Sequence, residues 1–219
     1  MLKAVLFDMD GVIVDTEPLH RKAYFKMFTD VGINVNEDLY TTFTGQSTMN
    51  ICKRLVSLYN LSYSSEYLTK LKRQHFDYLF KNDKQLQLIE GVLDLIKHYY
   101  SHNLKLVVAS SASMPNINSV FDRFELNQYF IGKFSGADLK QSKPHPEIFL
   151  KASEHTGYTV SECMVIEDST NGMKAAKAAN IFCAGFESKH SHDQDYSLAN
   201  IKVTSFKELY LEKLKSFFD

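Results

Sequence analysis

Short apolar runs alternate with helical patterns along this chain of 219 residues, and the alternation limits the folds that it can adopt. The runs cover residues 4–7, 104–109, 163–166 and 181–184, and helical spacing follows each of them instead of a hairpin turn. Strands that are separated by helices form parallel sheets whose two faces are both covered. The sequence therefore predicts an α/β protein with a doubly wound parallel sheet.

Two helices of this sheet have clear local signals. Pro146 and Glu147 suit the first turn of one helix, and Gly157 suits its end. A second helix is expected over residues 171–179, where alanines allow close packing on the sheet.

The pattern changes between residues 17 and 84, where apolar residues recur at helical spacing without a convincing strand. We expect an inserted all-helical cap domain at 17–84 and a core domain made of 1–16 and 85–219. Connections near 15–18 and 81–90 would then act as a hinge. An insertion hinged beside the end of a catalytic strand is typical of a lid.

The composition is that of an ordinary globular protein, with 44% hydrophobic residues and a formal net charge of −1. This charge gives no reason to expect a nucleic-acid partner, and no apolar run is long enough to cross a membrane. Cys52, Cys163 and Cys183 form no CxxC spacing, which indicates reduced thiols. We expect a cytoplasmic monomer, because no signal peptide is recognisable and the opening of a lid suits a monomer.

Two acidic residues follow the first apolar run with one residue between them. If the chain stays extended there, Asp8 and Asp10 point the same way from the carboxyl edge of the sheet. Neighbouring anions repel each other, and a divalent cation or a shared proton removes that repulsion. The alternative is a turn with two solvated acids.

Three further segments fall where the same edge of the sheet should lie. Ser110 and Ser111 end one strand, Lys143 stands in a proline-flanked loop, and Glu167 and Asp168 end another strand. Each has an ordinary explanation as a turn residue, a surface lysine or a helix cap. Together they supply hard oxygen ligands for Mg²⁺ and donors for a phosphoryl group, which are the parts that phosphoryl transfer needs.

Four motifs occur in one order along the whole chain. They are DxDGxxxDT at 8–16, the strand end at Ser110, the Lys-Pro-x-Pro loop at Lys143, and the acidic segment from Glu167 to Gly172. This set resembles the haloacid dehalogenase superfamily, and the helical insertion resembles its β-phosphoglucomutase-like branch. The resemblance implies a Rossmann-like core with a helical cap.

By this resemblance Asp8 is the nucleophile that forms an aspartyl phosphate. Asp10 would protonate the leaving oxygen and then deprotonate the acceptor, and Thr16 and His20 would help to position it. The acid at Asp10 argues against a true dehalogenase, which does not need it.

The resemblance also implies a Mg²⁺ cofactor. The Asp8 carboxylate, the Asp10 carbonyl and the Asp168 carboxylate would hold the ion, with Glu167 contributing directly or through water. The residues expected to bind phosphate oxygens are Ser110, Ser111 and Lys143.

The expected substrate is inferred from residues of the helical insertion. β-Phosphoglucomutases carry an arginine after a Gly-x-Ser segment, whereas Gly45-Gln46-Ser47 is followed here by Thr48. Gln74 stands roughly where those mutases have a sugar-contacting lysine. A mutase must rebind a bisphosphate, so the absence of the arginine favours hydrolysis.

We therefore expect a phosphatase that acts on a small sugar or polyol phosphate, with Gln46, Thr48 and Gln74 contacting it. A β-phosphoglucomutase, an inorganic pyrophosphatase and a non-catalytic phosphate-binding protein stay open as alternatives. The polar stretch 188–195 is expected to be a surface loop, and His190 and His192 leave a second metal site open.

Overall fold

A computed structural model describes residues 1–43, 46–189, 191 and 193–218 of the chain. Gly45, His190 and His192, which were singled out above, lie outside these residues. The chain divides into two compact units. Met1–Asp15 and Gln87–Asp219 form the sheet unit, and Thr16–Leu86 forms the helical unit.

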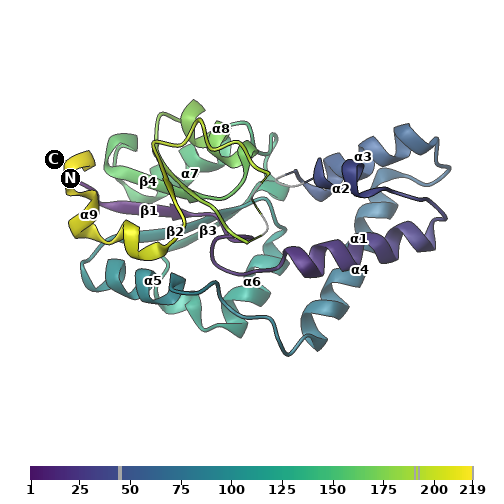
Figure 1. Cartoon of the computed structure of the whole chain (residues 1–219), viewed down its shortest axis with the longest axis horizontal. Coiled ribbons are helices and arrows are strands. Elements are labelled where there is room, and N and C mark those ends of the chain that lie inside the picture. The colour runs from purple at the N-terminus through teal and green to yellow at the C-terminus, as the bar shows by residue number, and fades with distance from the viewer. Residues whose placement is uncertain (44–45, 190, 192, 219) are drawn as a thin grey trace. The chain divides into compact units, whose positions relative to one another are not determined.

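The sheet unit contains six parallel strands in the order β3-β2-β1-β4-β5-β6 (Figure 1). This arrangement confirms the predicted doubly wound α/β fold. The strands are β1 (Ala4–Phe7), β2 (Lys105–Ser110), β3 (Gly132–Ser135), β4 (Cys163–Glu167), β5 (Phe182–Phe186) and β6 (Ile201–Val203).

Helices cover both faces of the sheet, with α7 and α8 on one side and α5 and α6 on the other (Figure 1). The helices of this unit are α5 (Val92–Ser101), α6 (Met114–Arg123), α7 (Glu147–Thr156), α8 (Thr170–Ala178) and α9 (Leu211–Phe218). Short 3-10 turns lie at Leu126–Gln128, Gly136–Asp138, Val160–Glu162 and Phe206–Leu209.

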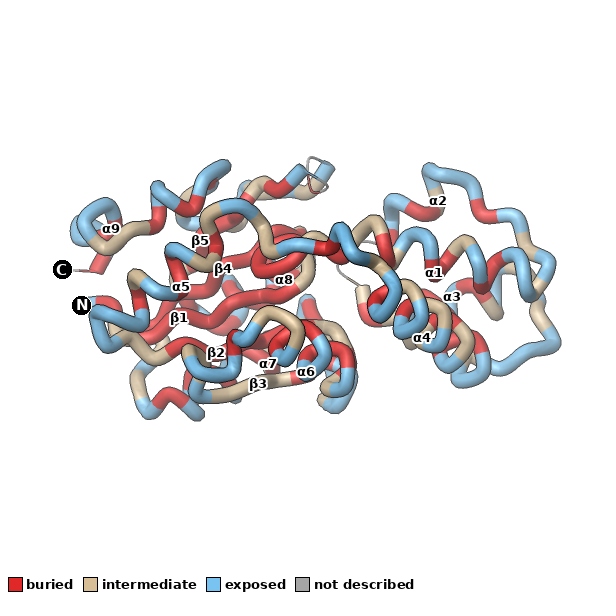
Figure 2. The backbone as a smooth tube through the Cα atoms, turned by 90° about the horizontal axis from the view of Figure 1, so that it is seen from below, coloured by how far each residue is buried: buried red, intermediate tan, exposed pale blue. Residues whose placement is uncertain are grey.

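Alternation along β1 explains how this strand is buried on both sides. Ala4 and Leu6 belong to the core that contains residues of α7 and α8. The ring of Phe7, on the opposite side, lies edge-on to the ring of Tyr99 of α5. All four residues of β1 are inaccessible to solvent, as the red segments of Figure 2 show. Asp8 therefore directly follows a strand that is closely packed on both of its faces.

The two strands that the sequence pattern missed, β3 and β6, are the outer strands of the sheet. Their burial is weaker than that of the inner strands, since β3 is mostly half-buried and β6 contains an exposed lysine. An edge strand has a neighbour on one side alone, so its sequence carries less of the apolar signal.

Helices α7 and α8 lie close to their predicted positions, with one correction. Pro146 is the residue before the first turn of α7 and not a residue within it. Gly157 ends α7 with a φ of 75°, a left-handed conformation that favours glycine. Ser169 caps α8 by accepting a hydrogen bond from the Gly172 amide.

The helical unit has its own apolar core. Its helices are α1 (Glu17–Asp30), α2 (Glu37–Thr41), α3 (Thr48–Tyr59) and α4 (Ser65–Asn82). Asn36, Ser47 and Ser64 cap the last three helices through side-chain oxygens that accept backbone N–H groups. Parts of the expected hinge are helical, because α1 begins at Glu17 and α4 runs to Asn82.

Two further features bear on the environment of the protein. None of the helices in the described part of the chain combines the length and the apolar character that a membrane crossing requires. The thiols of Cys52, Cys163 and Cys183 are buried and unbonded to one another, as their spacing predicted.

Candidate active site

Asp8 directly follows β1, which lies between β2 and β4 in the middle of the sheet. Its backbone N–H donates to the Ile166 carbonyl at 2.9 Å, so the pairing with β4 continues up to this residue. The side chain is 7% exposed. This position is the carboxyl edge of a parallel sheet, where open α/β folds bind their ligands.

A tight turn follows Asp8, and Asp168 packs against the glycine in this turn. The N–H groups of Val12, Ile13 and Val14 all donate toward the Met9 carbonyl, and Gly11 has a φ of 86°. A Cβ atom on Gly11 would lie 2.0 Å from Oδ2 of Asp168. The Asp168 carboxylate therefore lies against the bare backbone of this turn, and no residue other than glycine leaves room for it.

Lys143 joins three strand ends through one ammonium group. Its Nζ donates to Oδ1 of Asp8 at 2.5 Å, to Oε1 of Glu167 at 2.7 Å and to the Ala109 carbonyl at 2.9 Å. An ammonium has three hydrogens, so each of them has an acceptor. The lysine is buried, which rules out the surface position considered above.

Glu167 has hydrogen bonds on both of its carboxylate oxygens. Oε1 accepts from Lys143, and Oε2 accepts from the backbone N–H and the hydroxyl of Ser169. A Cβ atom on Gly172 would lie 1.7 Å from Oε1, so the carboxylate fills the space beside this helical glycine. Glu167 is thus arranged to orient Lys143.

Among the described residues of the site, carboxylates outnumber ammonium groups. Asp8 and Glu167 share the ammonium of Lys143, Asp168 lies against Gly11, and Asp10 is close enough to Asp8 to affect its pKa. Burial raises the pKa of Asp8, and the negative charges of Glu167 and Asp10 act in the same direction while Lys143 opposes them. Burial alone would lower the pKa of Lys143, but the carboxylates of Asp8 and Glu167 raise it, so the lysine stays charged.

Ser110 ends β2 beside these groups. Its Oγ accepts the Ala112 N–H at 3.0 Å and keeps its own hydrogen for another acceptor. The hydroxyl of Ser135 donates to the Ala112 carbonyl at 2.8 Å, which ties the turn after β2 to β3. Ser111, half-buried, lies in that turn.

The donor set fits a hard, open-sided cation site. Among the residues that the structure describes, no group of three or more His, Cys, Asp and Glu side chains is placed to hold a metal ion, so a cation here would also need backbone, water or phosphate oxygens. Oδ2 of Asp8 makes no hydrogen bond with the described residues, while Oδ1 is bonded to Lys143. Mg²⁺ is commonly held by one or two carboxylates with water and phosphate oxygens, and this geometry with its excess of negative charge suits such an ion.

Apart from the phosphate-binding Ser110, Ser111 and Lys143, the residues expected to contact substrate or to position Asp10 lie in the helical unit. Thr16 precedes α1 and is fully buried. The side-chain amide of Gln46 donates to the Thr42 carbonyl at 2.6 Å, and Thr48, half-buried, is the first residue of α3. Gln74 is exposed on α4. The structure thus divides the predicted site residues between the two units.

His20 has a partner that the sequence analysis missed. Its Nδ1 lies 2.6 Å from Nζ of Lys72, and its ring is stacked on Phe76. Because an ammonium can only donate, Nδ1 accepts this hydrogen bond. Lys72 is 1% exposed and lies on the same face of α4 as Phe76 and Phe80. A lysine within an apolar helical stripe was the signal that could have identified it.

Comparisons with known proteins agree with this geometry. The family model for haloacid dehalogenase-like hydrolases matches residues 5–186. A phosphorylated carbohydrates phosphatase of Thermotoga maritima is 32% identical over 184 residues, which are 82% of each chain. The chloroplastic protein SUPPRESSOR OF QUENCHING 1 of Arabidopsis thaliana is 34% identical over 186 residues, or 83% of this chain, which spans only 17% of that protein.

A solved structure gives the same result for the fold. The β-phosphoglucomutase of Clostridium difficile aligns with 100% of this chain and 97% of its own, at 28% identity and a TM-score of 0.84. These matches confirm the resemblance found in the motifs. The chain therefore belongs to the haloacid dehalogenase-like hydrolases, in their β-phosphoglucomutase-like branch, and is an enzyme of the hydrolase type.

Proposed function

We propose that this enzyme is a Mg²⁺-dependent phosphatase that hydrolyses a small sugar or polyol phosphate through an aspartyl phosphate at Asp8. The observation that supports the proposal is the hydrogen bonding of the two oxygens of the Asp8 carboxylate. Lys143 holds Oδ1, and Oδ2 is left without a hydrogen bond to the described residues. A carboxylate oriented in this way can present one oxygen to a phosphorus atom.

The reaction then runs in two steps. Asp8 forms a bond to phosphorus as the bond to the leaving oxygen breaks, and the carboxylic acid of Asp10 gives that oxygen its proton. Water next attacks the aspartyl phosphate, the Asp10 carboxylate takes the proton of this water, and inorganic phosphate leaves. Asp8 and Asp10 return to their starting forms, so the net reaction is ester and water to alcohol and phosphate.

The other residues of the site hold charge and geometry. Ser110 and Ser111 would donate to phosphate oxygens, and Lys143 would neutralise charge beside Asp8 while Glu167 keeps Lys143 in place. The Asp8 and Asp168 carboxylates and the Asp10 carbonyl would hold Mg²⁺. When bound, the ion supplies positive charge that offsets the negative charge of the phosphoryl group.

The choice of a carbohydrate phosphate rests on relatives and on the helical unit, which we propose to be a substrate-specifying cap with Thr16, His20, Gln46, Thr48 and Gln74 as its functional residues. The Thermotoga maritima relative acts on phosphorylated carbohydrates by its name. We further propose a monomer in the cytoplasm, and the unbonded thiols support a reducing compartment.

A mutase is the second candidate because of the likeness to a β-phosphoglucomutase. The side chain of Thr48 is uncharged and too short to replace an arginine that grips a distal phosphate. This observation favours the phosphatase over the mutase.

The test is a phosphate-release screen with sugar, polyol and nucleotide monophosphates and pyrophosphate, run beside a coupled assay for glucose 6-phosphate. We expect turnover of sugar or polyol phosphates that EDTA abolishes. Asp8→Asn should lower kcat/KM at least about 10³-fold, because a neutral amide is a poor nucleophile. Mass spectrometry of acid-quenched wild-type protein should find the phosphoryl group on the peptide that contains Asp8.

Asp77→Asn is the matched control, since Asp77 is an exposed residue of α4. Turnover that Asp8→Asn leaves unchanged would refute the nucleophile. Glucose 6-phosphate formed faster than free phosphate would decide for the mutase.

A further inference from the structure

The loop between β5 and β6 is bonded to the segment that carries Asp168. Oη of Tyr196 lies 3.2 Å from the Asp168 carbonyl and 2.7 Å from Oγ of Ser191. The carbonyls of Ser191 and Phe186 lie at 3.1 and 3.3 Å. A phenol has one hydrogen to donate, so these acceptors share it, and the hydroxyl lies where the loop, the end of β5 and the end of β4 meet.

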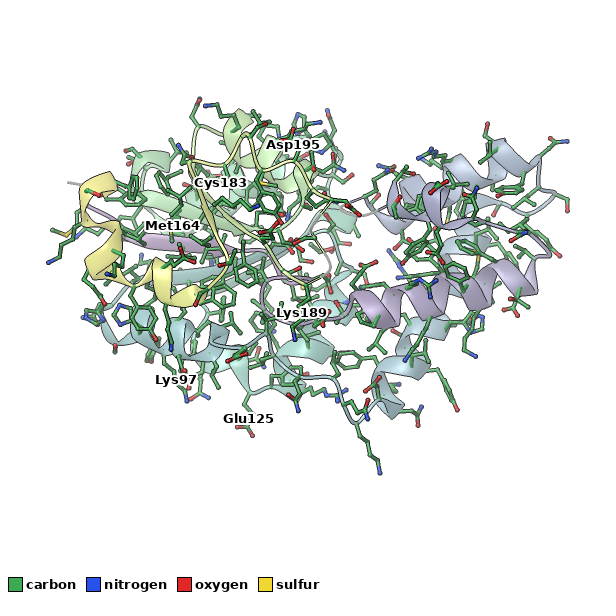
Figure 3. The ribbon with its side chains drawn as sticks, in the orientation of Figure 1. Lys97, Glu125, Met164, Cys183, Lys189 and Asp195 are labelled. Carbon is green, nitrogen blue, oxygen red and sulfur yellow. The ribbon has the colours of Figure 1, made fainter. Side chains whose placement is uncertain are left out.

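Two further hydrogen bonds join the same segments. Oε1 of Gln194 accepts the Thr170 N–H at 2.8 Å, and the Asp195 N–H donates to Oγ1 of Thr170, also at 2.8 Å. Asp195 is labelled on this loop in Figure 3. We call Gln194, Asp195 and Tyr196 the 194–196 anchor. The anchor bonds to residues on both sides of Ser169, the capping residue of α8.

The ring of Tyr196 has little freedom to move. A Cβ atom on Gly185 of β5 would lie 2.8 Å from Cδ1 of this ring, so the tyrosine packs directly on bare backbone. Nζ of Lys202 lies 4.9 Å from the ring centroid and also pairs with Glu187 at 2.9 Å. A hydroxyl on a ring held in this way has a defined position before any ligand binds.

The position of Asp168 needs such support because its carboxylate has so little clearance. It fits against Gly11 only because that residue lacks a Cβ atom, and a small shift of the Asp168 backbone would move the carboxylate into the turn or away from it. Outer residues that fix a metal ligand commonly contribute 10- to 100-fold to metal affinity or activity.

We propose that the 194–196 anchor is a positioning element that holds Asp168 in the geometry required for binding a divalent cation. This inference rests on the proposed function, since it assigns the anchor to the Mg²⁺ site of that reaction. Tyr196 acts through the Asp168 backbone and touches neither substrate nor ion.

The test is Tyr196→Phe in the full-length chain, which removes the hydroxyl and keeps the ring. We expect Mg²⁺ affinity, measured by titration calorimetry without substrate, to fall about 10-fold or more. Saturating Mg²⁺ should restore most of kcat, and amide hydrogen exchange in residues 168–172 should become faster. Tyr100→Phe is the control, because Tyr100 is exposed and its ring contacts only Tyr129 among the described aromatic residues.

If Tyr196→Phe lowers the melting temperature strongly, the same measurements are made on Gln194→Ala. This substitution is a smaller change at the surface. Unchanged Mg²⁺ affinity and unchanged exchange in a folded variant would overturn the role of the anchor and leave the phosphatase standing. A wild-type protein that neither binds Mg²⁺ nor releases phosphate would instead overturn the proposed function and the anchor's role with it.

Discussion

The sheet unit and the helical unit each hold a buried lysine, and the two are surrounded differently. Lys143 donates to two carboxylates and a carbonyl at the ends of three strands. Lys72 contacts the imidazole of His20, and its Nζ lies 4.8 and 5.0 Å from the ring centroids of Tyr24 and Phe76. A carboxylate favours the charged form of a lysine, and the face of an aromatic ring attracts an ammonium more weakly.

This difference indicates that the two units have different roles in the reaction. The sheet unit presents preorganised charge, which is the main requirement of phosphoryl transfer. The helical unit contributes aromatic rings, hydroxyls and amides, which suit selection among sugars and polyols. Variants of the first unit should therefore change kcat most, and variants of the second should change KM or substrate preference.

The largest expected difference comes from replacing each lysine by methionine. Lys143→Met leaves Asp8 and Glu167 buried without their cation, so we expect about 3–5 kcal/mol of lost stability and about 10³-fold lower kcat. Lys72→Met removes the donor to His20 but suits the neighbouring rings, and we expect a loss of about 1–2 kcal/mol. Urea unfolding and steady-state kinetics measure both effects. Equal losses in the two variants would end the distinction between the lysines.

A smaller difference in activity is expected when alanine replaces each of two glycines, Gly172 and Gly32, whose surroundings differ. Gly172→Ala places a Cβ atom onto the Glu167 carboxylate, so we expect about 1–3 kcal/mol of strain and at least a tenfold lower kcat. Gly32 of the helical unit has a φ of 69° and nothing within 4 Å of an added Cβ. Gly32→Ala should cost about 1–2 kcal/mol of stability through its backbone alone and leave kcat unchanged. Loss of activity in both would mean that destabilisation, and not the displacement of Glu167, is responsible.

The smallest effect concerns substrate choice. Thr48→Arg restores a guanidinium where the mutases carry one, so we expect KM for a sugar bisphosphate to fall about tenfold, a gain typical of one added charged contact. The kcat for a monophosphate should change little, because Thr48 belongs to the helical unit. Competition between the two substrates gives the ratio directly. A fall in kcat with no change in preference would argue that this position does not select the substrate.

Much of the fold could be predicted because its signals are local. The four inner strands are continuous apolar runs, and Gly157 ends α7 as expected. The outer strands β3 and β6 were not predicted, because half-exposed strands lack a continuous apolar pattern. Asp8, Lys143 and Glu167 lie together at one edge of the sheet, but the hydrogen bond between Lys143 and Glu167 was not predicted, because it joins a loop to the end of β4 across 24 residues.

The sequence alone determined which chemical groups follow which strands. Extended backbone, caps and proline positions depend on a few neighbouring residues, so Asp8, Ser110, Lys143 and Asp168 could be read in order. Only the tertiary structure decided that Lys143 reaches Asp8 across 135 residues, that Gly11 makes room for Asp168, and that Tyr196 bonds to the Asp168 carbonyl. Those contacts depend on how crossovers bring distant loops to one edge of the sheet, and no local pattern encodes that distance.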